Sequence, residues 1–92
     1  MIAAVEFEAF IMDAHTLKDK RGVLQRILRR LSQKYNVAVA EVDYQDLWQR
    51  TRIAVVTVSS SKIAAEKELQ QALKFVDSFP EIERTITEFQ WV

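Results

Sequence analysis

The 92-residue sequence predicts an α+β fold in which two helices cover one face of a four-stranded antiparallel sheet. The first observation behind this prediction is the apolar period, which alternates between about 2 and 3.6 residues in the order strand, helix, strand, strand, helix, strand. The second is the length, because a chain this short holds one core, so we expect a single domain over residues 1–92. Such a domain buries only about 60–65 % of its unfolded surface, so a subunit interface would add useful burial.

The first two elements follow from their apolar spacing. Residues 3–12 alternate strictly, which is typical of a strand. Residues 17–35 carry leucine and isoleucine at helical spacing, and Thr16 is the predicted N-cap, with Asp19 three residues later as in a capping box. Gly22 lies inside this helix at a cost of about 1 kcal/mol relative to alanine, which close packing on the sheet would explain.

A helix stop and two strands come next. Asn36 is expected to end the first helix in the left-handed conformation. Residues 37–44 then read as a short strand, residues 45–49 as a connection, and residues 50–59 as a longer strand with apolar residues on both faces. The sequence therefore predicts two consecutive strands joined by a short connection.

The last two elements complete the pattern. Residues 62–77 form the second predicted helix, with caps available among the serines at 59–61. The expected buried stripe of this helix is Ile63, Leu69, Ala72, Leu73 and Val76. Pro80 lies in the segment that ends the helix, and residues 82–92 return to an extended pattern.

This element order is that of a ferredoxin-like domain. Right-handed crossovers then place both helices on one face of the sheet, with the first and third strands central. The other face would carry Phe10, Met12, Ile86, Val92 and one apolar set of the third strand, either Ile53 and Val55 or Ala54, Val56 and Val58. We expect this apolar face to be covered, most simply in a homodimer. The expected interface residues are Phe10, Met12, Trp48, Val56, Val58 and Ile86.

The charge is divided unevenly along a chain whose net charge is zero. Residues 14–34 contain seven cations and one anion, and the remaining residues contain six cations and twelve anions. A basic helix on an acidic body permits a polyanionic partner such as RNA. The cations expected on the outer face of this helix are Lys18, Arg26, Arg29, Arg30 and Lys34.

The start of the first helix allows two interpretations. In the first, the backbone N–H groups of its first turn bind a phosphate together with His15, Lys18, Lys20 and Arg21. In the second, Lys20 or Arg21 forms an internal ion pair with Asp43 or Asp46 in the connection between the two middle strands. Lys20 falls within the apolar stripe of the helix, so it must reach past the sheet or meet a carboxylate.

Several classes of function are disfavoured. There is no cysteine, so disulfides and thiolate chemistry are excluded, and the single glycine excludes glycine-rich phosphate loops and the GxxG clamp of KH domains. The lone histidine, His15, with Asp13, Asp43 or Asp46, is a weak basis for a metal or catalytic site, so we expect no metal, no cofactor and no enzymatic activity. No apolar run reaches about 20 residues and no signal peptide is recognisable, so we expect a cytoplasmic protein without membrane contact.

Three segments together resemble a known family. The strings "AHTLKDKR", "NVAVAEVDYQDLWQR" and "AVVTVSS" are similar to those of the YlxP-like proteins, a bacterial family also called domain of unknown function 503. Mild departures from the usual form are Thr16 for serine, Asp19 for glutamate, and Ser60 and Ser61 for Asn-Asp. The resemblance implies a ferredoxin-like fold, and it implies no activity because the family has no established one. The genes of this family often lie beside those for translation initiation and ribosome maturation factors.

These observations lead to a functional expectation. We expect a non-enzymatic protein that binds RNA or a ribosomal component through its basic first helix. The alternative is a protein-interaction or homo-oligomerisation module that uses the apolar sheet face. A third hypothesis is a small-molecule hydrolase or ligand-sensing domain. Trp48 could stack on a base or, as is more usual for tryptophan beside apolar neighbours, pack in the protein or an interface.

Overall fold

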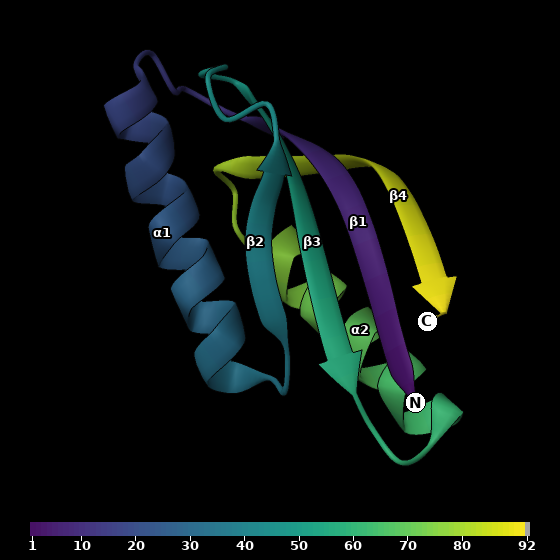
Figure 1. Ribbon diagram of the computed structural model, residues 1–92. Coiled ribbons are helices and arrows are strands. Elements are labelled where there is room, and N and C mark those ends of the chain that lie inside the picture. Colours follow the sequence, from purple (N-terminus) through teal and green to yellow (C-terminus); the bar gives the residue numbers. More distant parts are fainter. Residues whose placement is uncertain (92) are drawn as a thin grey trace.

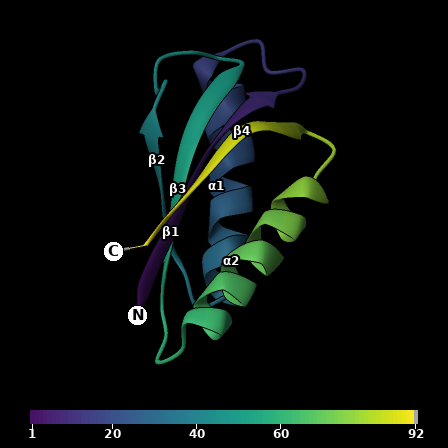
Figure 2. The ribbon, with the colours of Figure 1, turned by 90° about the vertical axis from the view of Figure 1, so that its right-hand side faces the viewer.

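The computed structural model describes residues 1–91 and has the predicted order of elements. These elements are β1 (Ile2–Ile11), α1 (Leu17–Lys34), β2 (Ala38–Asp43), β3 (Arg50–Val58), α2 (Lys62–Asp77) and β4 (Ile82–Trp91) (Figure 1). The strands form one antiparallel sheet in the order β2-β3-β1-β4, so the first and third strands are central, as predicted. Figure 2 shows both helices on the same face of the sheet. The fold is therefore the predicted ferredoxin-like α+β arrangement.

The core lies between the helices and one face of the sheet. Phe7 of β1 and Ile53 of β3 are fully buried and are paired directly across the two central strands. Since alternate residues of a strand point to opposite faces, this register settles which residues of β3 face the helices. Ile53 and Val55 point into the core, and the other set, Ala54, Val56 and Val58, faces away from the helices.

Side chains cap both helices at their N-termini. The hydroxyl of Thr16 accepts a hydrogen bond from the backbone N–H of Asp19 at 3.0 Å, which confirms the predicted cap. The carboxylate of Asp19 reaches back to the N–H of His15 at 3.3 Å rather than to that of Thr16, so the reciprocal bond falls one residue earlier than in a capping box. Ser61 is the serine that caps α2, since its hydroxyl accepts from the N–H of Ala64 at 3.3 Å.

Two local expectations, for Gly22 and Asn36, are wrong. Gly22 lies on the exposed side of α1, and a Cβ atom added there would meet no heavy atom within 4 Å, so close packing on the sheet does not explain it. Asn36 is not a left-handed helix stop, because among residues 1–91 only Asp13 and Tyr44 combine a side chain with a positive φ. Asn36 instead binds other elements, since its N–H donates to Glu68 at 2.7 Å and its side-chain amide donates to a carbonyl of β3.

The buried apolar stripe of α2 differs from the predicted one in the first turn of the helix. Ile63 was expected in the core, but its side chain is 79 % exposed. Ala65 is the first buried residue of the helix, followed by the predicted Leu69, Ala72, Leu73 and Val76. The first turn of α2 therefore extends beyond the sheet. Within residues 1–91, neither helix combines the length and the apolar character that crossing a membrane requires.

Candidate functional site

The outer face of α1 contains a shallow hollow of about 370 Å³. It is lined by Gly22, Gln25, Arg26, Arg29, Arg30 and Gln33. The lining side chains are guanidinium and amide groups, all of which donate hydrogen bonds, and none is a carboxylate. Because Gly22 has no side chain, the helix backbone is uncovered at one edge of this hollow. We call this surface the arginine face.

Three predicted cations of α1 turn toward the C-terminal end of α2. Arg26 forms an ion pair with Glu81, just before β4. The guanidinium of Arg30 lies 5.8 Å from the centre of the Phe79 ring, and the Lys34 ammonium lies 4.7 Å from the centre of the Phe75 ring. A cation–π contact orients a cation without neutralising it. Only Arg26 therefore has its charge balanced by these contacts.

Three other predicted cations of α1 face solvent. Lys18, Arg21 and Arg29 are exposed, and none has a carboxylate within 4.0 Å among residues 1–91. Arg29 lines the arginine face, whereas Lys18 and Arg21 lie nearer the start of the helix. Together with Arg30 and Lys34, they leave α1 with an excess of uncompensated positive charge.

Lys20 does not belong to this exposed set. Its side chain is 1 % exposed, and its Nζ atom lies 2.9 Å from Oε2 of Glu41 and donates to the carbonyl of Tyr44 at 2.5 Å. The hydroxyl of Thr51 donates to the same oxygen, Oε2 of Glu41, at 2.6 Å. The prediction that Lys20 binds an anion is therefore wrong, and so is the choice of its acidic partner. Within the described residues 1–91, the Asp43 carboxylate accepts only from a neighbouring backbone N–H, that of Tyr44.

The predicted phosphate site at the first turn is correspondingly reduced. His15 is exposed near the start of α1, and the structure shows a hydrogen bond only from its backbone N–H. With Lys20 withdrawn, the exposed members of the predicted site are His15, Lys18 and Arg21. Among residues 1–91, no group of three or more histidine, aspartate or glutamate side chains is arranged to hold a metal ion.

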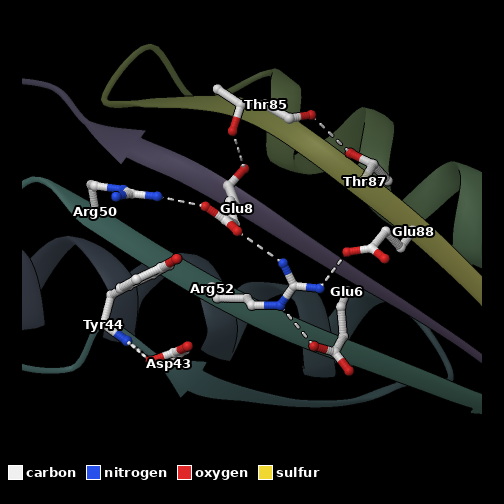
Figure 3. A network of polar contacts seen from close by, with 9 residues as sticks. All are labelled: Glu6, Glu8, Asp43, Tyr44, Arg50, Arg52, Thr85, Thr87 and Glu88. Carbon is white, nitrogen blue, oxygen red and sulfur yellow. Dashed lines mark hydrogen bonds and ion pairs between the residues drawn. The ribbon is translucent and has the colours of Figure 1, made fainter.

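The centre of the open sheet face is charged, which corrects the expectation of an apolar face. Figure 3 shows Arg52 of β3 between three carboxylates, those of Glu6 at 2.8 Å, Glu8 at 3.0 Å and Glu88 at 2.7 Å. Arg50 is paired with Glu8 at 2.7 Å. Hydrogen bonds to Glu88 and then to Glu6 raise the pKa of Arg52 above its ordinary value. The sequence missed this network because it depends on the register of three strands.

The predicted interface residues lie around this charged centre. Phe10, Met12, Trp48, Val58 and Ile86 are all exposed, and Val56 is half-buried. Val58 pairs with the start of β1, whereas Phe10 pairs with the start of β3, so these two lie at opposite ends of the sheet. Trp48 is 52 % exposed, so it is not packed inside the subunit.

Comparisons with known proteins agree with the fold and the motifs. The family model described as protein of unknown function DUF503 matches residues 2–89. The uncharacterised protein YlxP of Bacillus subtilis (strain 168) is 56 % identical over 91 residues, covering 99 % of each chain. The sequence motifs, the element order and these two matches agree, and the chain belongs to the DUF503 family.

Proposed function

We propose that this protein binds RNA, free or in a ribosomal particle, through the arginine face of α1. The observation that carries the proposal is the composition of that hollow, in which Gln25 and Gln33 flank three arginines, Arg26, Arg29 and Arg30, and no carboxylate is among the lining residues. Guanidinium groups form two-pronged hydrogen bonds with phosphate, and amides add contacts to sugar and phosphate oxygens. A shallow, open hollow suits a nucleic-acid backbone better than a small molecule.

The positive charges of α1 predict that RNA binding depends strongly on salt concentration. Contacts to phosphates release counterions, so the logarithm of the binding constant falls linearly with the logarithm of salt concentration, with a slope of about 0.7–0.9 per neutralised phosphate. Arg29 is the strongest candidate contact, because it lines the hollow and has no carboxylate within 4.0 Å among the described residues. Arg26 would have to share its guanidinium with Glu81. The proposal is of a binding protein in the cytoplasm, without catalysis.

A filter-binding titration of fragmented ribosomal RNA across a salt series tests the proposal. The test variant is Arg29→Glu, and the matched control is Lys67→Glu, since Lys67 is also an exposed helical cation without an ion pair within residues 1–91. We expect Arg29→Glu to weaken binding about tenfold at about 50 mM salt and to reduce the salt slope, because at least one phosphate contact is lost. Equal affinities for Arg29→Glu and Lys67→Glu, or no binding at low salt, would reject the arginine face as the site.

The sheet face supports a second candidate function, homo-oligomerisation. Val58 and Ile86 are each about 60 % exposed on or beside the open face, whereas Ala54 and Val56 present a flat, half-buried surface between β2 and β1. A two-fold contact would pair this surface with itself. Sedimentation velocity at micromolar concentration, with Val58→Asp as the disruptive variant, tests the homodimer. Wild-type protein that sediments only as a monomer would exclude it at that concentration.

A further inference from the structure

A second hollow, of about 440 Å³, lies where β1 ends and β3 begins. It is lined by Phe10, Asp46, Leu47, Trp48, Gln49 and Arg50, and we call it the Trp48 pocket. Phe10, Leu47 and Trp48 are each about half exposed, so three large apolar side chains meet solvent in one place. Contiguous exposed apolar surface of this kind marks a binding site more often than scattered single residues do.

The loop that presents Trp48 is held by hydrogen bonds from three directions. The carbonyl of Tyr44 accepts from the buried Lys20 ammonium at 2.5 Å and from the N–H of Leu47 at 3.0 Å. At the other end of the loop, the carbonyl of Gln49 accepts from the N–H of Ile11 at 2.9 Å. A side chain displayed on a fixed backbone loses little conformational entropy on binding. The Trp48 pocket is therefore preorganised.

The one cation that lines this pocket is already engaged. Arg50 is paired with Glu8 at 2.7 Å, and its guanidinium lies 4.4 Å from the centre of the Tyr44 ring (Figure 3). Tyr44 itself has a left-handed backbone, with φ of 61°, which places its ring under Arg50. The planar guanidinium of Arg50 therefore lines one side of the pocket, and its positive charge is balanced by Glu8.

The rim of the pocket is acidic. Asp46 lines it, and Glu83 is the cross-strand partner of Phe10. Neither of these two carboxylates has a cation within 4.0 Å among residues 1–91. An apolar centre inside an acidic rim attracts a cationic ligand and repels a phosphate.

The geometry points to a basic segment of a partner protein as the ligand of the Trp48 pocket. One aromatic or long aliphatic side chain of that segment packs between Trp48 and Phe10, while lysines or arginines beside it meet Asp46 and Glu83. RNA is disfavoured here because its phosphates would approach uncompensated carboxylates. A second copy is disfavoured too, because a two-fold contact through this pocket would bring two acidic rims together.

The inference goes beyond the proposed RNA site and does not depend on it. The arginine face belongs to α1, whereas the Trp48 pocket is built from β1, β3 and the connection between β2 and β3. The two sites have opposite charge, so one protein could hold RNA and a basic protein at the same time. Arg29→Glu should weaken RNA binding and leave the Trp48 pocket unchanged.

Fluorescence of Trp48 provides a direct readout. The chain has two tryptophans, so in a Trp91→Phe background Trp48 is the sole emitter. The probe is the synthetic peptide acetyl-KRKFKRK-amide, compared at about 50 mM salt with acetyl-KRKSKRK-amide, with acetyl-EDEFEDE-amide and with oligouridylate. We expect a blue shift with the first peptide and an affinity about tenfold higher than for either of the other peptides.

Paired variants test the rim. Asp46→Lys combined with Glu83→Lys should weaken binding of the basic peptide about tenfold, whereas Glu66→Lys, at an exposed position of α2, should not. The proposal is overturned if the three peptides bind equally or none shifts the emission of Trp48. It is also overturned if oligouridylate binds there more tightly, or if sedimentation shows that free protein forms a dimer that Trp48→Ala abolishes. Circular dichroism of each variant verifies folding, and Trp48→Phe, which keeps an aromatic anchor, should retain peptide binding measured by calorimetry.

Discussion

The ammonium of Lys20 and the carboxylate of Glu41 lie 2.9 Å apart and form a buried ion pair between the first turn of α1 and the edge strand β2. The same ammonium donates to the carbonyl of Tyr44, and the hydroxyl of Thr51 donates to the same carboxylate. The Lys20 ammonium and the Oε2 atom of Glu41 thus each have two partners within the subunit. Through these contacts, Lys20 connects the helix that carries the arginine face to the loop that carries Trp48.

Replacing Lys20 should destabilise the protein strongly. Lys20→Met leaves the partly buried carboxylate of Glu41 without its cation, and breaking a fully buried pair costs about 3–5 kcal/mol, which is the upper limit for this pair. Adding Glu41→Gln should recover part of that loss, because the remaining side chain is then uncharged. Urea denaturation measures both, with Lys18→Met as the exposed control, expected within about 0.5 kcal/mol of wild type. A similar small effect for Lys20→Met would show that the pair contributes little.

Alanine at position 22 should stabilise the fold. Gly22→Ala adds a methyl group that meets no atom within 4 Å and removes the conformational freedom of glycine in a helix interior. The expected gain is about 1 kcal/mol, seen as a rise in melting temperature. Gln25→Ala, on the same exposed face, serves as the control and should change stability by only a few tenths of a kcal/mol. A lower melting temperature for Gly22→Ala would contradict this account.

The charge network on the sheet face should stabilise the fold over a wide pH range. Arg52→Met leaves Glu6, Glu8 and Glu88 close together without their shared cation, so the urea midpoint should fall. The pKa of Arg52 is raised on folding, so its contribution is complete below the ordinary pKa of arginine and is lost only as the pH passes the raised value. The difference in urea midpoint between wild type and Arg52→Met should therefore be the same at about pH 7 as at about pH 10. Convergence of the two midpoints by about pH 10 would contradict the raised pKa.

The register of α2 predicts unequal effects of truncation along the helix. Leu69→Ala creates a cavity at a side chain that is 1 % exposed, so it should cost about 2–5 kcal/mol of unfolding free energy. Ile63→Ala should change stability by no more than about 0.5 kcal/mol, because Ile63 is 79 % exposed. Guanidinium denaturation distinguishes these outcomes. A large loss of unfolding free energy for Ile63→Ala would mean that Ile63 is buried after all, either in the core, as the sequence predicted, or in an oligomer interface.

The sequence by itself determined the order of the elements, the two central strands, the cap at Thr16 and the concentration of positive charge on α1. Each of these depends on local properties, namely the apolar period, capping chemistry and composition, which are readable along the chain. The family was recognisable for a similar reason, since its motifs are contiguous.

Only the tertiary structure decided which charges are free. Lys20 pairs with Glu41 rather than Asp43 or Asp46 because Glu41 lies on the helix-facing side of β2, a side that depends on how β2 pairs with β3. Arg52 likewise meets carboxylates from two other strands, whose contact requires the register of the sheet. Ion pairs join residues far apart in sequence, and their partners are chosen by strand register and helix docking, which no local pattern encodes. Among the described residues, this pairing leaves Arg29 and Arg30 of the arginine face and Asp46 and Glu83 beside the Trp48 pocket without a partner of opposite charge.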